Sequence, residues 1–263
     1  MTLSQRLRAV LPPDTATIWE LIAAVLPPAL YLAGGTGLAA HLHHRVSRDL
    51  DFFYHENAVD LDSLSGTLAA VAPFAVTARS PGTLTGILSH TKVQFLHADE
   101  SEPQHLLEPP TAVEGLAVAS ISDIFALKLN AVAKRGELRD YFDLEVIEER
   151  TRCTVEEGLS LMLGRYGREP SDAVLGPVVR ALGYLDDVDE DARLPLDKKA
   201  IADYWRRRQP QILASLSRQL PMPAVALPAA SAQSWALRGL DQLFADAPAG
   251  ESTDAIRDAR DAR

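Results

Sequence analysis

Residues 33–53 read Ala-Gly-Gly-Thr-Gly-Leu-Ala-Ala-His-Leu-His-His-Arg-Val-Ser-Arg-Asp-Leu-Asp-Phe-Phe. The stretch predicts a glycine turn after a short apolar strand at 30–32, then about two and a half turns of helix, then a second strand. Residues two apart on a strand point to the same face, so Asp49 and Asp51 should project together while Leu50 and Phe52 face a core. Two adjacent carboxylates raise each other's pKa unless a cation lies between them. The simplest such cation is Mg²⁺, which commonly holds phosphates.

The bulk composition predicts a folded cytoplasmic protein without a membrane partner. A chain of 263 residues can form one large domain, or a domain with a helical part appended. Its net charge of −10 argues against non-specific coating of nucleic acid but leaves room for a local basic patch. The single cysteine, Cys153, cannot form an internal disulfide, which favours a reducing compartment. Neither a long apolar run nor a basic-then-apolar secretion signal is visible.

The N-terminal half has the pattern of an α/β unit. Helices are predicted over 2–11, 15–26 and 60–71. Short strands are predicted at Phe74–Arg79, Leu84–Leu88 and Lys92–Leu96, the last two forming a hairpin. The polar, proline-bearing residues 99–114 indicate a boundary.

From Ser120 the pattern becomes helical, beginning with a capping-box-like Ser120-Ile-Ser-Asp123. Helices are predicted at about 120–133, 137–150, 154–166, 171–183, 197–217 (with a kink at Pro210) and 231–245. Residues 247–263 lack an apolar face and are predicted to be a disordered tail. The expected organisation is a core over 1–115, a helical domain over 116–246, and the tail.

Lys128 lies on the apolar stripe of its predicted helix, with Ile124 and Val132 four residues away on either side. An ammonium group there is costly unless it reaches solvent or an anion. Two interpretations stay open: a lysine that snorkels at a domain seam, and a lysine that reaches a nucleotide phosphate.

Asp140 and Asp143 lie one turn apart on the next predicted helix, with Asp143 bordering its inward face. Ordinary helix salt bridges are one explanation, pairing Arg139 with Asp143 and Asp140 with Arg135 or Lys134, each contributing about 0.3 kcal/mol. A functional explanation gains weight because Lys128 and Asp143 are both inward-facing polar groups on successive helices.

Two further patterns are weak by themselves. His41, His43 and His44 lack the spacing of a known metal motif, so a solvent-facing helix end is the favoured interpretation. The turn at 34–37 has neither the Lys-Ser/Thr of a P-loop nor dinucleotide-fingerprint spacing. It does open a helix, and the amides of a helix N-terminus favour an anion.

Taken in order, four motifs resemble the AbiEii/AbiGii toxin family of nucleotidyltransferases: Gly34-Gly35-Thr36, His44 to Phe53, Lys128-Leu-Asn-Ala, and Arg139-Asp140-Tyr-Phe-Asp143-Leu144. The resemblance runs from about 30 to 150. Members of this family are similar to the toxin half of type IV toxin–antitoxin and phage-defence operons. The resemblance implies an α+β fold, with a DNA-polymerase-β-like core of small mixed sheet and helices followed by a helical region, and a cognate antitoxin.

The resemblance also implies roles for particular residues. Asp49 and Asp51 would hold Mg²⁺, Lys128 would bind phosphate, and Asp143 would be a catalytic carboxylate with Asp140 as its neighbour. Arg48, beside the metal pair, and Arg139 are further candidate site residues. The nucleotide would contact Gly34, Gly35, Thr36, Ser47 and Lys128. Ser47 also matches a serine whose phosphorylation silences some related toxins. Relatives transfer a nucleotide from an NTP to the 3′ end of tRNA, which blocks translation.

One position departs from that pattern. Polymerase-β-like enzymes usually place a third acid on a later strand, where this chain has Lys92-Val-Gln-Phe-Leu96. Neither Lys92 nor Gln94 can act as an acidic metal ligand. Either Asp143 supplies that carboxylate from a helix, or turnover is slow or lost.

The leading hypothesis is therefore a Mg²⁺- and NTP-dependent nucleotidyltransferase toxin that acts on tRNA. Its candidate RNA contacts are Arg45, Arg48, Lys134, Arg135, Arg139 and the run Arg206-Arg207-Arg208, the last being equally compatible with a solvated helix face. Two alternatives stay open: transfer to a small molecule, as in antibiotic nucleotidyltransferases, and a catalytically weak nucleotide-binding protein.

Overall fold

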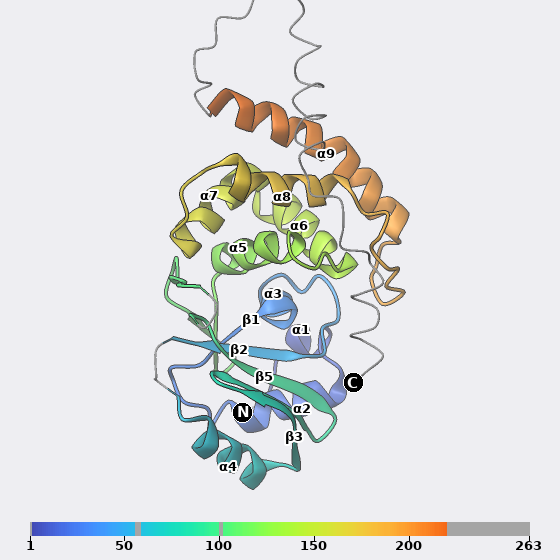
Figure 1. The fold of residues 1–263 in the computed structure, drawn as a ribbon. Coiled ribbons are helices and arrows are strands. Elements are labelled where there is room, and N and C mark those ends of the chain that lie inside the picture. Colours follow the sequence, from blue (N-terminus) through green and yellow to red (C-terminus); the bar gives the residue numbers. More distant parts are fainter. Residues whose placement is uncertain (1, 56–58, 100–101, 220–263) are drawn as a thin grey trace, which may run out of the picture. The chain divides into compact units, whose positions relative to one another are not determined.

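A mixed β-sheet organises the N-terminal half of the protein (Figure 1). The computed structural model describes residues 2–55, 59–99 and 102–219. In these residues the strand order is β3-β4-β5-β2-β1-β7-β6, with β2–β5 and β1–β7 parallel and the other pairs antiparallel. The strands are β1 (Tyr31–Ala33), β2 (Leu50–Tyr54), β3 (Phe74–Ser80), β4 (Thr83–Leu88), β5 (Thr91–His97), β6 (Thr111–Val113) and β7 (Leu116–Val118).

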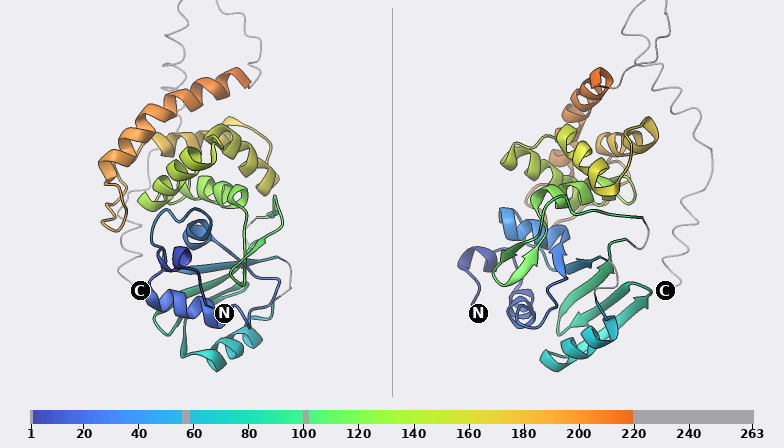
Figure 2. Two further views of the ribbon diagram at one scale, coloured as in Figure 1. Left: turned by 180° about the vertical axis from the view of Figure 1, so that it is seen from behind. Right: turned by 90° about the vertical axis from the view of Figure 1, so that its left-hand side faces the viewer.

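The helices form two groups, as the ribbon shows from three sides (Figures 1 and 2). The first group accompanies the sheet: α1 (Gln5–Arg8), α2 (Pro13–Ile22), α3 (Gly34–Leu42) and α4 (Leu61–Val71). The second builds a helical layer: α5 (Ile121–Val132), α6 (Leu138–Thr151), α7 (Val155–Tyr166), α8 (Asp172–Gly183) and α9 (Lys198–Gln219). The predicted α+β class, with a mixed sheet followed by helices, is confirmed.

The period-2 pattern of the strands separates two hydrophobic cores. Leu32, Leu50 and Phe52 pack with apolar residues of α2 and α4 on one face of the sheet. Tyr31 and Ala33 instead join a core made mainly by α5 to α9. Because neighbouring strand residues face opposite sides, the side chains that alternate with Leu50 and Phe52 point toward the helical layer.

Three features differ from the sequence prediction. Strands β6 and β7 were not predicted, because three-residue strands are too short to show a period. The first two helices differ from 2–11 and 15–26: α1 covers only Gln5–Arg8, and α2 begins earlier, with Pro13 as its first residue, and ends earlier, at Ile22. Helix α9 ends at Gln219, two residues beyond the predicted 217, and has Pro210 in its interior.

Helix 231–245 and the tail at 247–263 lie outside the described residues. Among the helices that are described, none has both the length and the apolar character that a membrane span requires.

Candidate active site

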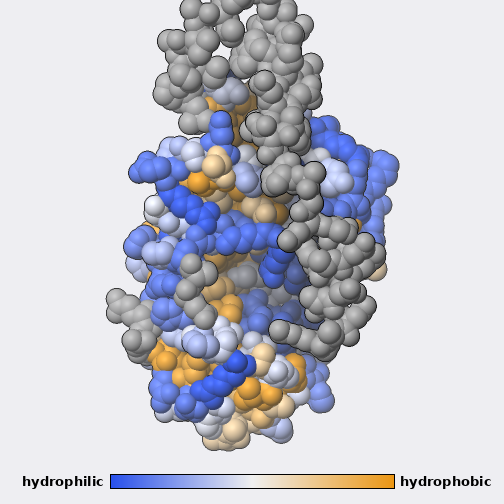
Figure 3. Space-filling model, viewed as in Figure 1, coloured by the Kyte–Doolittle hydropathy of each residue, from blue (hydrophilic) through white to orange (hydrophobic). Residues whose placement is uncertain are grey.

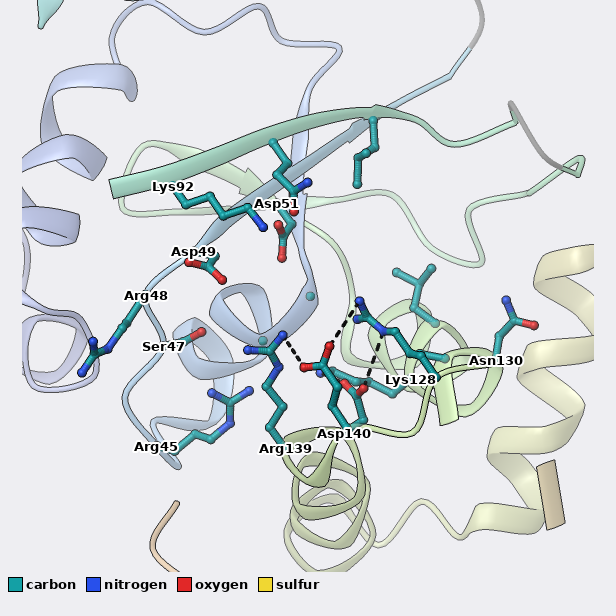
Figure 4. Close-up of a pocket in the computed structure, with 18 of the residues that line it drawn as sticks. Arg45, Ser47, Arg48, Asp49, Asp51, Lys92, Lys128, Asn130, Arg139 and Asp140 are labelled. Atoms are coloured by element: carbon teal, nitrogen blue, oxygen red, sulfur yellow. Dashed lines mark hydrogen bonds and ion pairs between the residues drawn. The ribbon is translucent and has the colours of Figure 1, made fainter. Parts of the chain in front are cut away.

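Asp49 and Asp51 line one pocket at the start of β2 (Figure 4). In the sheet Asp51 lies beside Ala33 of β1 and Gln94 of β5. Burial raises the pKa of Asp51, and the neighbouring Asp49 raises it further. The structure therefore brings together the two carboxylates that the strand pattern places on one face.

Helix α3 begins at Gly34, against this carboxylate pair. Gly34 has a φ of +63°, and a Cβ there would lie 2.9 Å from Asp51 Oδ2. A Cβ on Gly35 would lie 2.5 Å from a guanidinium nitrogen of Arg45. The N-cap residue, Ala33, gives the first-turn amides no side-chain hydrogen bond. The two glycines thus bring a helix N-terminus, which attracts anions, close to both Asp51 and Arg45.

The hydroxyl groups of Thr36 and Ser47 connect α3 to the segment that carries Asp49. They are hydrogen-bonded to each other at 2.8 Å, and the Thr36 hydroxyl also donates to the Asp49 carbonyl. Both residues are buried, yet only Ser47 lines the pocket. Thr36 therefore positions the pocket wall from beneath it.

Replacing Gly34 with alanine should distort this junction. The new methyl group would meet Asp51 Oδ2, and alanine adopts this backbone conformation only with strain. We therefore expect destabilisation by about 1–3 kcal/mol and lower activity at this pocket. Gly66 in α4 is a matched control, because a Cβ there meets no atom within 4 Å. Gly66→Ala should stabilise by about 0.5–1 kcal/mol. Urea denaturation measures both, and equal effects would contradict this account.

Asp143 anchors a buried cluster of charges between α6, α5 and the segment after α3. It accepts hydrogen bonds from Arg45 Nε (2.6 Å) and Nη2 (2.8 Å), lies 2.8 Å from His44 Nε2, and pairs with Lys128 Nζ at 2.8 Å. Burial alone would raise the pKa of Asp143, but Lys128 and Arg45 hold it well below its usual range. The carboxylate is fully buried and does not line the pocket.

Lys128 lines the pocket and is held there by two carboxylates. Its ammonium donates to Asp140 Oδ1 at 2.6 Å, in addition to its contact with Asp143. Burial would lower the pKa of Lys128, but Asp140 and Asp143 raise it above the ordinary value, so the lysine is charged. A snorkelling lysine would be exposed, whereas this side chain is 7% exposed. Its charge is fixed at the pocket wall.

Asp140 is the acid of α6 that lines the pocket. Its Oδ2 is buried without a hydrogen bond, and Arg135 Nε lies 3.9 Å away. The alternative salt bridge between Arg139 and Asp143 is not formed, because Arg139 pairs with Glu137 at 2.5 Å. Of the predicted salt bridge between Asp140 and Arg135, only the 3.9 Å contact is present.

Two other predictions need correction or refinement. His44 does not face solvent, since its side chain is fully buried against Asp143, although His43 is exposed. In the run Arg206–Arg208, Arg208 forms ion pairs with Glu148 and Glu156, and Arg206 pairs with Asp203. None of these three arginines lines the pocket.

The pocket has a volume of about 740 Å³ and a positive lining. Hydrophilic surface dominates the band where the helical layer meets the sheet (Figure 3). The lining side chains sum to +3, and still to +1 when Asp143 and Glu102, which pair with three of the lining cations from behind the lining, are included, although the whole chain carries −10. Its cations are Arg45, Arg48, Lys92, Lys128, Lys134, Arg135, Arg139 and Arg193, and its acids are Asp49, Asp51, Glu137, Asp140 and Asp191.

Sequence reasoning missed Asp191 and Arg193, which reach the pocket from the loop between α8 and α9. Their side chains form a two-pronged ion pair, with both N–O distances at 2.7 Å. The loop is far from the motifs along the chain and has no periodic pattern, so no sequence signal marks it. Arg48 was predicted near the site and does line the pocket, but it points away from the carboxylate pair (Figure 4).

The donor set suits a hard divalent cation such as Mg²⁺. Asp49 and Asp51 offer paired carboxylate oxygens. Burial and then repulsion from Asp49 raise the pKa of Asp51, and a bound cation would offset both by stabilising the ionised form. Within 2–55, 59–99 and 102–219, no three His, Cys, Asp or Glu side chains cluster to form a metal site. Substrate phosphates would have to complete the coordination, as is common for Mg²⁺.

A family profile covers most of the chain. The profile, described as "Nucleotidyl transferase AbiEii toxin, Type IV TA system", matches residues 18–238. An uncharacterized protein of Aquifex aeolicus, aq_aa25, is 27% identical over 188 residues, which are 70% of this chain and 87% of that protein.

Two solved structures are among those to which the chain is similar. JHP933 from Helicobacter pylori is 19% identical with a TM-score of 0.49, covering 91% of this chain and 99% of that one. The nucleotidyltransferase toxin MenT4 from Mycobacterium tuberculosis is 18% identical with a TM-score of 0.37, covering 74% and 88%.

The matching profile, which covers most of the chain, identifies the protein as a nucleotidyltransferase. The chain belongs to the AbiEii nucleotidyltransferase toxin family of type IV toxin–antitoxin systems. Membership implies an NTP substrate and an antitoxin partner.

Proposed function

We propose that this protein uses Mg²⁺ to transfer a nucleoside monophosphate from an NTP to an RNA hydroxyl, most specifically at the 3′ end of tRNA. We place this reaction in the cytoplasm, where the modified tRNA would block translation. One observation carries the proposal: eight lysine and arginine side chains gather around the carboxylate pair in a chain of net charge −10. Such a field attracts polyanions, and a triphosphate together with an RNA terminus is polyanionic.

The proposed reaction is an in-line displacement at the α-phosphorus. The acceptor oxygen forms a bond to that phosphorus, and the bond to the oxygen bridging the α- and β-phosphates breaks. Pyrophosphate leaves with the electron pair of that bond, and the acceptor proton passes to a base or to water. A bound Mg²⁺ would neutralise charge on the phosphates.

The residues of this chain would divide the remaining work. The first amides of α3, at Gly34 and Gly35, would bind phosphate oxygens, together with Lys128 and Arg45. Asp143 would act through the two cations that it holds, as a positioning residue. This assignment differs from the catalytic carboxylate that the resemblance implies, because all four contacts of Asp143 are made inside the protein.

Proton acceptance would then fall to Asp140 or to water. Asp140 lines the pocket, and its Oδ2 accepts no hydrogen bond. A general base needs a free oxygen within reach of the acceptor hydroxyl, and because Oδ2 of Asp140 is buried, water is the favoured acceptor in the structure as it stands.

The charge of the pocket also weighs against the small-molecule alternative. A cationic acceptor, such as an aminoglycoside, needs acidic walls, whereas Arg135, Arg139 and Arg193 line this pocket. A catalytically weak nucleotide-binding protein is the remaining alternative, motivated by Lys92 and Gln94 on β5.

Label transfer tests the proposal. Purified protein is incubated with Mg²⁺, each α-labelled NTP in turn, and either total tRNA or an aminoglycoside. We expect label on tRNA with at least one NTP, and none on tRNA whose 3′ ends have been oxidised. Label on the aminoglycoside alone would support the small-molecule alternative. Nucleotide binding without transfer to either acceptor would support the catalytically weak one.

A further inference from the structure

The β5 side of the carboxylate pair presents a positive charge and a neutral amide. Asp51 lies beside Gln94, and Leu50 lies beside Val93. Continuing this parallel register by one residue places Asp49 alongside Lys92. Lys92 and Gln94 line the same pocket as the two acids. Four side chains on adjacent strands thus form one patch that contains two carboxylates, one ammonium and one amide.

Lys92 is directed at the carboxylates. Figure 4 shows its side chain extending toward Asp51, and Lys92 is the strongest of the cations that oppose the rise in the pKa of Asp51. Among the described residues its ammonium makes no ion pair within 4 Å and no hydrogen bond, so it is available to a ligand in the pocket. Gln94 Nε2 meanwhile donates to the Thr85 hydroxyl at 3.1 Å, which fixes the amide.

The balance of charge limits how many metal ions this patch can hold. Three carboxylates can hold two divalent cations between them. Here there are only two carboxylates, and the Lys92 ammonium lies next to them. A second divalent ion would lie close to the first ion and to the Lys92 ammonium, with the substrate phosphates but no third carboxylate to offset their charge, and like charges at such short range repel strongly in a partly buried site.

Resting on the proposed nucleotidyl transfer, we propose that Asp49 and Asp51 hold a single divalent ion, and that the Lys92 ammonium serves as a fixed second cation facing the substrate phosphates. Lys92 would then be a substrate-binding residue. The absence of an acid on β5 would be part of a one-metal site and would not mark a loss of activity.

Counting bound Mn²⁺ tests this inference. Electron paramagnetic resonance measures Mn²⁺ bound per chain in the presence of the α,β-methylene analogue of each NTP, with protein-free samples accounting for metal on the analogue alone. We expect one Mn²⁺ per wild-type chain. Lys92→Asp, which supplies a third carboxylate, should bind two, and Lys92→Arg, which keeps the charge, should bind one.

A second variant keeps the test informative if Lys92→Asp does not fold. Lys92→Met removes the competing cation and should tighten Mn²⁺ binding roughly fivefold to tenfold. Two Mn²⁺ on the wild type, or unchanged Mn²⁺ affinity in Lys92→Met, would overturn the inference while leaving the proposed transfer reaction intact. No Mn²⁺ on the wild type with any analogue would count against the transfer reaction as well.

Discussion

Asp51→Asn should abolish nucleotidyl transfer, lowering its rate by about a thousandfold or more, as the loss of a central electrostatic group does in other enzymes. Asp51 is half-buried on β2 and lies against the start of α3. An asparagine has nearly the same shape but removes the negative charge that would hold Mg²⁺. Rates of α-label transfer measure the effect.

The same variant should not be less stable than the wild type. Holding a buried carboxylate ionised beside Asp49 is unfavourable, so a neutral amide relieves repulsion and the melting temperature should stay the same or rise. Asp62→Asn is the control, because Asp62 is an exposed acid on α4 that pairs with Arg79. It should change neither property. Retained transfer by Asp51→Asn would remove the carboxylate pair from the mechanism.

Asp143→Ala should have the largest effect on stability, costing about 3–5 kcal/mol. The substitution leaves the Lys128 and Arg45 charges buried without their shared partner, and His44 loses its hydrogen bond. For a domain of this size the melting temperature should fall by roughly 6–20 °C. Asp203→Ala on α9 removes exposed ion pairs with Lys199 and Arg206 instead, and should leave the unfolding midpoint unchanged.

The effect of Asp143→Ala should also depend on pH. Because the folded-state pKa of Asp143 is depressed, its contribution is complete above the unfolded pKa of about 4 and is lost as pH falls through the folded value. The gap between wild type and variant should therefore be constant from pH 6 to pH 8 and shrink below pH 4. Chemical denaturation across this range measures it. Equal stability of the two proteins at neutral pH would show that the buried cluster is not a structural anchor.

Local patterns were enough to predict the parts of the site that depend on one element at a time. The period of β2 predicts that Asp49 and Asp51 share a face, and the apolar stripe of α5 predicts an inward Lys128. Both predictions are confirmed by the pocket lining and the burial.

What could not be predicted depends on how distant elements pack. Arg45 and Asp143 are 98 residues apart, and their pairing depends on how the segment after α3 meets α6. Arg193 reaches the pocket from the loop between α8 and α9, and the path of that loop cannot be predicted from a sequence pattern. His44 was misjudged for the same reason, since a helix end is buried only when another element covers it.

The most direct test of the account is the mass of tRNA after incubation with protein, Mg²⁺ and NTP. We predict a gain of one or more nucleotide residues at the 3′ end with wild-type protein, and none with Asp51→Asn. An unchanged mass with every NTP, or the same gain with Asp51→Asn, would contradict the claim that this pocket transfers nucleotides to RNA.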